Sequence, residues 1–375
     1  MSTVEKALNH SKKIGIDECE IVLVKKKITT VRITDSEIAE IKQNFDESYG
    51  IRIIHQKKIA SSQSTDKQNI NKNIENIFDT ISNLKPREFW EELPYKARLK
   101  KLDGTFDEKL KNISGSNAMD IAQDMINSTI NNKVSTITGS LNIVSEDVQL
   151  SNSNGLELAD ESTYITGIIN AESEFGNIPV SGIGHASGRT LLNFSAEQIG
   201  KDAKNMCIKA INPQKIDSGK YSIIFEPYSV GELLAFVVAA NFNFKTFSEK
   251  KSCFSNDLDK KIGIDELNLI DDPHIPEGIG TKSIDDEGIE TQKRNLIENG
   301  IFKNTFSNLY DSFKEGVKST GNSSRGGSPM GRSSEPIPIS APHNLKVNPG
   351  TSSQEDMIKD TKQGLLVGRL WYTYA

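Results

Sequence analysis

Residues 134–171, VSTITGSLNIVSEDVQLSNSNGLELADESTYITGIINA, contain two long β-forming runs on either side of the dipeptide Asn154-Gly155. Asn-Gly between alternating apolar runs is the strongest short hairpin signal, because both residues tolerate the backbone angles of a tight turn. We therefore predict an antiparallel hairpin with residues 134–150 and 156–171 as its strands.

The rest of the first half alternates helix and strand patterns. Ser2 and Glu5 form a capping-box signature, and apolar residues follow it at helical spacing. Strands are predicted for residues 19–24, 28–33, 49–54 and 59–62, and helices for residues 70–81, for residues 117–130 and after Ser195. Residues 84–116 are charged and weakly periodic, so we expect a connection with short helical pieces there.

The second half has dense turns and few helices. Strands are predicted for residues 221–225, 267–271, 293–298 and 301–306. Asn299-Gly300 gives a second two-residue hairpin turn. Residues 230–240 are predicted to form a short buried helix.

The expected fold class is α+β. We place a domain boundary near Pro213, between a mixed α/β domain of residues 1–213 and a mostly antiparallel, barrel-like β domain of residues 214–375. The chain ends at residues 371–375 inside an aromatic, strand-like run, which would leave an unpaired edge. The sequence leaves open whether the chain is naturally short or truncated.

Composition excludes several classes of function. The net charge of −6 and the pI near 5.6 argue against a nucleic-acid surface, which needs a basic face. No run approaches the roughly 18 apolar residues of a membrane span, and the polar start of the chain does not resemble a signal peptide. Three widely spaced cysteines fit a reducing compartment, so we expect a cytoplasmic protein.

The histidines do not encode a local zinc site. Zinc peptidases of the HExxH kind place two histidines on one helical face with a glutamate as the base. The five histidines are widely spaced, and none is followed by glutamate; they are His10, His55, His185, His274 and His343. A lone histidine such as His185 is more typical of a loop or a core than of a metal site.

Two acidic clusters invite a metal or catalytic interpretation. They contain Asp271 and Asp272, and Asp285, Asp286 and Glu287 followed by Gly288. Calcium loops alternate their ligands at fixed offsets, whereas these acids are consecutive. Consecutive acids beside proline or glycine are typical of turns, because their side chains accept bonds from nearby backbone N–H groups. We assign these residues, with Asn299 and Gly300, to structural turns.

The Gly- and Ser-rich segment 319–334 has three open interpretations. A phosphate-binding P-loop would need lysine where Gly327 stands. A flexible surface loop is the first alternative. A substrate-facing loop is the second, with the candidate residues Gly321, Asn322, Arg325 and Arg332, whose arginines can pair with a carboxylate or phosphate. Nucleotide binding is the third.

A series of short motifs resembles the TldD/PmbA family of modulators and metallopeptidases. In chain order they are residues 269–273 (LIDDP), 283–288 (SIDDEG), 296–300 (LIENG), 320–322 (TGN), 343–345 (HNL), 348–350 (NPG) and 364–367 (GLLV). The order of the series is far more specific than any one motif. In this family, TldD-type members have a zinc-binding HExxxH helix, and PmbA members, also called TldE, do not.

The resemblance implies which branch this chain is similar to. Aligning residues 231–234 (GELL) with the family stretch before HExxxH places Ala235 and Ala240 at the two histidine positions and Phe236 at the glutamate position. Histidines five residues apart share a face only where the helix widens or bends. All three positions are apolar here, so the chain resembles the PmbA/TldE branch.

The resemblance implies a non-catalytic role in a larger system. We expect no cofactor in this chain and zinc only in a TldD-type partner. The two chains together would act on extended peptides. Otherwise, this chain would self-associate. Alone it would be inactive. The alternative from another class is a non-enzymatic binding or regulatory protein. A third hypothesis is a catalyst around Arg325, Asp285 and Asp286.

Overall fold

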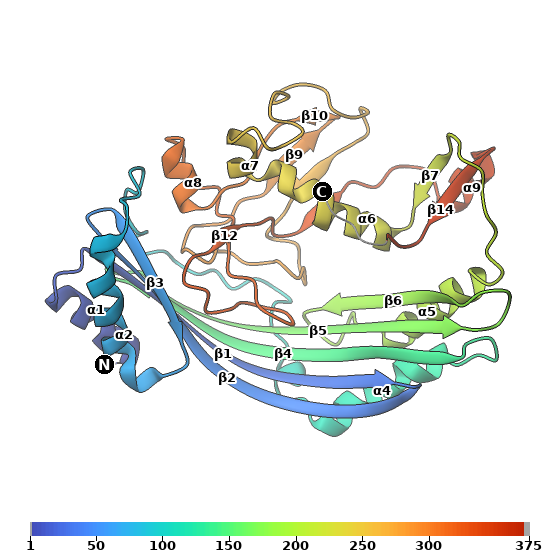
Figure 1. Cartoon of the computed structure of the whole chain (residues 1–375), viewed down its shortest axis with the longest axis horizontal. Coiled ribbons are helices and arrows are strands. Elements are labelled where there is room, and N and C mark those ends of the chain that lie inside the picture. Colours follow the sequence, from blue (N-terminus) through green and yellow to red (C-terminus); the bar gives the residue numbers. More distant parts are fainter. Residues whose placement is uncertain (1, 371–375) are drawn as a thin grey trace.

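A curved six-stranded antiparallel sheet dominates the first half of the chain (Figure 1). The structure is a computed structural model that describes residues 2–370. The strand order is β3-β2-β1-β4-β5-β6. The strands are β1 (Glu18–Thr34), β2 (Glu37–His55), β3 (Lys58–Ser64), β4 (Thr136–Asn152), β5 (Glu157–Ser173) and β6 (Val180–Gly188).

The predicted hairpin is present as β4 and β5. Ser151 pairs with Glu157, and the backbone N–H of Asn152 donates to the carbonyl of Leu156 at 3.0 Å. Three residues therefore form the turn, not two, and Gly155 takes the left-handed conformation at φ +91°. This is the arrangement of three-residue hairpin loops, in which a glycine follows two right-handed residues.

The strands before the hairpin are longer than predicted. Residues 19–24 and 28–33 belong to one continuous strand, β1, although Lys25, Lys26 and Lys27 stand at its centre. β2 begins at Glu37, whereas the apolar pattern begins only near Tyr49. The polar first part of β2 is exposed. Its extended conformation is therefore stabilised by backbone pairing with β1 and not by burial of apolar side chains.

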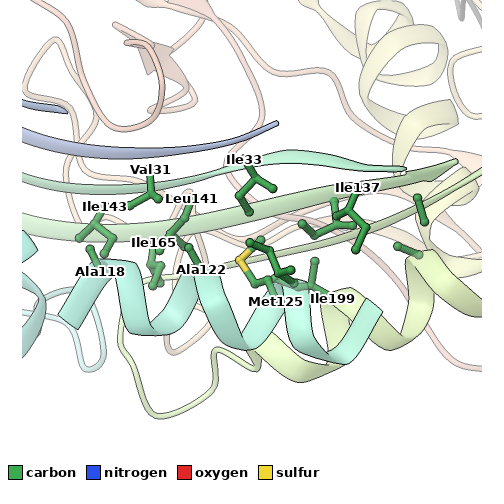
Figure 2. Close-up of a cluster of buried hydrophobic side chains, with 14 of the residues drawn as sticks. Val31, Ile33, Ala118, Ala122, Met125, Ile137, Leu141, Ile143, Ile165 and Ile199 are labelled. Carbon is green, nitrogen blue, oxygen red and sulfur yellow. The ribbon is translucent and has the colours of Figure 1, made fainter. Parts of the chain in front are cut away.

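Helices cover the outer face of this sheet in two groups (Figure 1). One group is α1 (Thr3–Lys13) and α2 (Ile70–Thr80), and the other is α3 (Glu108–Lys111), α4 (Gly115–Thr129) and α5 (Ala196–Lys209). The capping box of Ser2 and Glu5 is present at α1. Under α4 and α5, side chains such as Val31, Met125 and Ile199 form a closely packed core (Figure 2).

β6 was not predicted, because its sequence VSGIGHASG is rich in glycine. The packing of α5 explains these glycines. A Cβ at Gly182 would lie 2.1 Å from the backbone nitrogen of Cys207, and one at Gly184 would lie 1.9 Å from the carbonyl oxygen of Ile199. The helix rests directly on the strand backbone, which only glycine permits.

The second half lies within the concave side of the large sheet (Figure 1). Its helices are α6 (Pro227–Leu233), α7 (Phe244–Ser248), α8 (Leu309–Lys314) and α9 (Gln354–Asp360). Its strands are β7 (Ser222–Phe225), β8 (Leu269–Asp271), β9 (Arg294–Glu298), β10 (Ile301–Phe302), β11 (Ser323–Ser324), β12 (Ile339–Ser340), β13 (Leu345–Val347) and β14 (Gly364–Val367).

These strands form small sheets. One sheet has the order β10-β9-β8-β13, and the other two have two strands each. The α+β class with mostly antiparallel sheets is confirmed. Within residues 2–370 no closed barrel is present, so the barrel-like form is not confirmed. Strands of two to five residues, separated by long turns, are too short to close around a common axis.

One small sheet is parallel and joins distant parts of the chain. β7 pairs with β14, with Ser222 beside Gly364 and Phe225 beside Val367. The backbone N–H of Ser222 also donates to the carbonyl of Gln363. The predicted strand-like run at residues 371–375 lies outside the described residues. None of the helices between residues 2 and 370 combines the length and the apolar character that a membrane span requires.

Replacing Gly300 with alanine should destabilise the protein by about 1–3 kcal/mol. Asn299 and Gly300 are the predicted two-residue turn between β9 and β10, both with positive φ. A Cβ at Gly300 would lie 2.4 Å from the carbonyl oxygen of Ile264. Urea unfolding measures the loss. The control is Gly231→Ala in α6, where nothing lies within 4 Å of the added Cβ and stability should hold or rise. Equal stability of the two variants would contradict this account.

Candidate functional site

The helical segment after β7 widens in its middle. Pro227 occupies the first turn of α6, where its missing N–H costs nothing. The Ser229 hydroxyl donates to the carbonyl of Val367 at 2.6 Å and anchors α6 to β14. Residues Leu234–Val238 then form a π-helical turn, and Ala239–Phe242 a 3-10 turn. A π turn brings residues five apart onto one face, and such turns occur often at functional sites.

The three positions aligned with the family zinc motif are exposed on this segment. Ala235 and Ala240 are exposed, and the Phe236 side chain is 61% exposed. The prediction of a short buried helix over residues 230–240 is therefore wrong at these three positions. Leu234 and Val238 are only half-buried, because the core around Phe242 covers the segment from one side. The widening that the HExxxH spacing requires is present, although alanines occupy the ends of that spacing.

A polar cluster on β5 and β6 lies beside α6. The His185 and Tyr228 rings lie 5.9 Å apart. His185 Nε2 lies 3.1 Å from the Ser187 hydroxyl and 3.3 Å from the Thr166 hydroxyl. Burial lowers the pKa of His185, so the imidazole is neutral at pH 7. The interpretation of His185 as a loop or core residue misses its place on a strand, which the glycines around it conceal.

A chain of buried charges connects the large sheet to the second half. Arg52 donates to Glu287 at 2.7 Å and to Glu20 at 3.0 Å. Glu20 also accepts from Arg325. These side chains are almost completely buried. Buried ions are tolerated only when they are paired and hydrogen-bonded, so the chain of charges fixes how the two halves meet.

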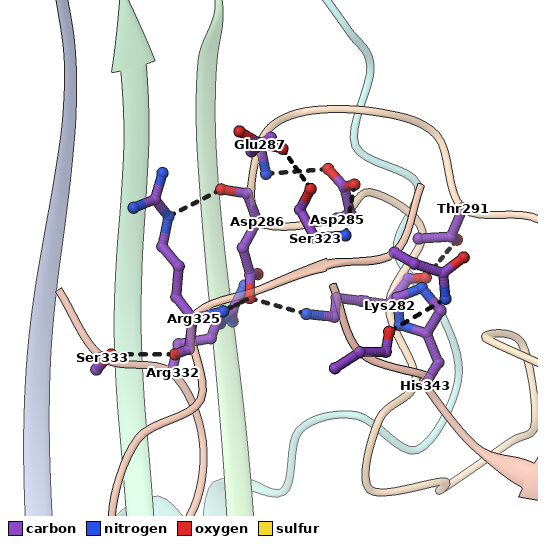
Figure 3. A network of polar contacts seen from close by, with 12 residues as sticks. Lys282, Asp285, Asp286, Glu287, Thr291, Ser323, Arg325, Arg332, Ser333 and His343 are labelled. Carbon is purple, nitrogen blue, oxygen red and sulfur yellow. Dashed lines mark hydrogen bonds and ion pairs between the residues drawn. The ribbon is translucent and has the colours of Figure 1, made fainter. Parts of the chain in front are cut away.

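The second acidic cluster accepts bonds from its own turn and from β11 (Figure 3). Asp285 accepts from the backbone N–H groups of Glu287 at 2.9 Å and Ser323 at 3.0 Å. Asp286 accepts from Lys282 at 2.9 Å and from the backbone of Arg325 at 2.7 Å. Each carboxylate is thus occupied by protein donors.

The first acidic cluster is engaged in the same way. Asp271 is fully buried and accepts from the Asn322 side chain and from the backbone of His343, both at 2.7 Å. Asp272 accepts from the backbone of His274. His343 reaches the carbonyl of Gly321 at 2.7 Å. Gly321 and Asn322 are buried in this arrangement and do not face solvent.

The Gly- and Ser-rich segment packs on the concave face of the sheet. Arg332 bonds to Glu146 at 2.8 Å and to Asp160 at 2.7 Å. Lys26 donates to the carbonyl of Met330 at 2.8 Å. The interpretation as a flexible surface loop is therefore wrong for most of this segment. The serines and glycines allow close packing against buried charges, which composition alone does not reveal.

The space beside Arg325 and Arg332 is small. The cavity bounded by Asp285, Asp286 and these two arginines has a volume of about 30 Å³. A cavity of this size holds one or two waters. In the described part of the chain, no group of three or more His, Cys, Asp or Glu residues could hold a metal ion.

Burial and neighbouring charges separate the pKa values of the three consecutive acids. Burial, and then the charge of Glu287, raise the pKa of Asp285 to about 7. Burial acts in the same direction on Asp286 and Glu287. Burial is the largest single influence on each, but opposing influences together exceed it and hold the pKa of each below its usual value. For Asp286 these are the positive charges of Lys282 and Arg332 with the hydrogen bonds it accepts, and for Glu287 the charge of Arg52 with the hydrogen bonds it accepts.

Acid should destabilise the protein through Asp286 and Glu287. Their pKa values are lower in the folded state than in the unfolded state, so their stabilisation is complete at pH 7 and is lost as pH falls through the folded-state values. The contribution of Asp285 to stability changes with pH in the opposite direction. Its pKa is raised in the folded state, so it favours folding only while it is protonated. Urea unfolding between pH 7 and about pH 3 should show that Glu287→Gln is less stable at pH 7 and less sensitive to acid.

A surface carboxylate provides the control for this pH dependence. Glu290 forms an ion pair with exposed Lys100, and exposed pairs contribute little. Glu290→Gln should therefore keep the wild-type pH profile. If Glu287→Gln also keeps that profile, the assignment of acid sensitivity to the buried pair is wrong.

Several residues of this network were not predicted. Glu20, Arg52 and Glu146 lie on strands and point into the concave side of the sheet. A signal was present for Glu20, which stands between Cys19 and Ile21 in the otherwise apolar predicted strand 19–24. A charge at such a position predicts a buried partner, but the sequence does not show which residue supplies it.

Comparisons with known proteins agree with this architecture. A family model described as the PmbA/TldA metallopeptidase C-terminal domain matches residues 218–374, and one described as PmbA/TldA metallopeptidase domain 1 matches residues 19–85. TldE from Thermococcus kodakarensis has the same fold, with a TM-score of 0.86 at 22% sequence identity, over 98% of this chain and 83% of TldE.

Curated relatives match over different spans. An uncharacterised protein of Methanocaldococcus jannaschii is 25% identical over 325 residues, 86% of this chain and 74% of that protein. The metalloprotease PmbA of Escherichia coli O157:H7 is 28% identical over 185 residues, 49% of this chain and only 37% of PmbA. The chain therefore has the α+β fold of the PmbA/TldA metallopeptidase domains. The chain belongs to the TldD/PmbA family.

Proposed function

We propose that this chain is the zinc-free, PmbA/TldE-like subunit of a two-component cytoplasmic metallopeptidase. The observation that carries the proposal is the widened turn. It has the spacing that a pair of histidines would need, yet it presents Ala235, Phe236 and Ala240. None of these side chains has a ligand atom or a group that transfers protons. Zinc and its bound water would therefore come from a TldD-type partner.

The role of this chain would be to bind substrate and to complete the assembly. Extended peptides can add to the open edge of a sheet, where backbone hydrogen bonds give affinity with little demand on sequence. The β6 edge is open on one side and lies close to α6, which supports a peptide-binding role there. Such binding suits proteolysis of unstructured polypeptides or maturation of peptides.

The test is to purify this chain alone and together with a TldD-type subunit. Alone, it should hold substoichiometric zinc and leave an unstructured peptide uncleaved. Together, the two chains should co-elute, and cleavage should require the partner's HExxxH motif. Stoichiometric zinc and peptidase activity in the lone chain would overturn the proposal.

Two other functions remain as outcomes of this test. If no HExxxH-bearing relative co-elutes, a non-enzymatic binding or regulatory role is supported. Catalysis around Arg325, Asp285 and Asp286 is disfavoured by the small cavity and by the protein donors that occupy these carboxylates. It would be supported only if substitutions there abolished turnover and left folding and pairing intact.

A further inference from the structure

A polar hollow lies beside the hairpin of β9 and β10. It is lined by seven residues between positions 292 and 304, and each of them has a polar or charged side chain. Its volume is about 520 Å³, and small-molecule pockets have roughly 300–1,000 Å³. In Figure 1 this hairpin lies at the top of the view, away from the large sheet. The hollow shares no lining residue with the widened turn or with the buried chain of charges.

Arg294, the first residue of β9, has unused hydrogen-bonding capacity at this hollow. Its Nε is buried and has no hydrogen-bond partner in the described part of the chain. One terminal nitrogen makes only a long bond, 3.4 Å, to the side-chain oxygen of Asn304. Burial lowers the pKa of the Arg294 guanidinium, which nonetheless stays protonated. A half-buried cation with an unsatisfied donor is costly, so a further acceptor would stabilise it.

The neighbouring carboxylate does not supply that acceptor. Asp271 lies opposite Arg294 on β8 and attracts it electrostatically, but no ion pair joins the two side chains. The oxygens of Asp271 instead accept from the Asn322 side chain and from the backbone N–H groups of His343 and Asn344. The guanidinium of Arg294 therefore has donors left in the planar fork that matches a phosphate or a carboxylate.

Two lysines add positive charge to the hollow. Lys293 is 57% exposed and lies 3.4 Å from Asp272, and Lys303 lies 2.9 Å from Asp259, which is 71% exposed. Exposed ion pairs contribute little, so either ammonium group can turn toward an anion at small cost. The lining thus contains three cations and one carboxylate, Glu298, on a chain whose net charge is −6.

We propose that this hollow binds the phosphate group of a small hydrophilic molecule, with Arg294 as the anchor. A phosphate monoester carries a charge of about −1.5 to −2 at pH 7, which suits three cations better than a carboxylate does. Apolar and aromatic ligand groups are held by apolar walls, and the seven lining residues provide none. The inference is independent of the proposed function, because binding can be measured on this chain alone and without a peptide.

Calorimetric titration of the full chain at low salt tests the ligand class. Inorganic phosphate and glucose 6-phosphate should both bind with a Kd of about 1 mM or tighter, and glucose should not bind. Tighter binding of the ester would identify an esterified ligand, and equal binding would show that the phosphate group alone is recognised. Acetate should bind more weakly than phosphate. Acetate binding as tight as that of phosphate would overturn the assignment to phosphate.

Two substitutions of opposite sign test the site. Arg294→Gln should weaken phosphate binding about tenfold or more, because it removes the charge-assisted fork. Glu298→Gln should tighten binding about threefold, because it removes the one lining carboxylate. The control is Arg98→Gln, the same change at an exposed arginine outside the hollow, which should have no effect. A wild-type chain that does not bind phosphate at about 10 mM would overturn the proposal. So would an Arg294→Gln variant that is folded by circular dichroism and binds like the wild type.

Discussion

Placing histidine at positions 235 and 240 and glutamate at position 236 should create a zinc site on the widened turn. The positions are exposed, and the π-helical turn over Leu234–Val238 includes position 235 and ends two residues before position 240. Two histidines on one face supply half of a tetrahedral site, and water or a nearby side chain completes it. Metal analysis of the triple variant should change from substoichiometric zinc to about one zinc per chain.

The spacing of the histidines is the control for this experiment. A regular α-helix brings residues four apart together, so Phe236→His with Ala240→His, both at exposed positions, would bind zinc well only if the turn were regular. We expect the five-residue spacing to bind more tightly. Equal or tighter binding by the four-residue pair, with both variants folded, would mean that the widened turn does not set the geometry.

Replacing Arg52 with methionine should destabilise the protein by about 3–5 kcal/mol. Arg52 is buried and neutralises both Glu20 and Glu287. Methionine nearly fills the volume of the side chain but leaves two buried carboxylates with one fewer cation. Chemical denaturation should show a lower midpoint with an unchanged slope.

An exposed ion pair gives the matched comparison. Lys201 pairs with Glu197 one turn away on α5, and both side chains are at least half-exposed. Lys201→Met should cost less than about 0.5 kcal/mol. If Arg52→Met costs no more than this, the buried chain of charges does not hold the two halves together.

The first half was largely predictable because its patterns are local. The hairpin around Asn154-Gly155 and the cap at Ser2 each depend on a few neighbouring residues, and both are present. β6 escaped prediction because its glycines serve contact with α5, which is remote in sequence. The polar start of β2 escaped because pairing, and not burial, holds it extended.

The second half was less predictable because its structure depends on distant partners. The Asn299-Gly300 turn is local and is present as predicted. Arg325 and Asn322, by contrast, are ordered by Glu20 and Asp271, which lie far away in the sequence. Serine and glycine around them resembled a mobile loop, since composition does not report contacts with another part of the fold. The apolar residues at 235, 236 and 240 were identified, but their exposure was not.

The parallel pairing of β7 with β14 has a mechanical consequence. The chain enters the second half through β7 and reaches β14 at its far end, and the two strands run in the same direction, side by side. Tension applied across this half would therefore pull the strands past each other, which loads their hydrogen bonds together and not one after another. We expect the second half to resist stretching as a unit and to yield abruptly once these few bonds break.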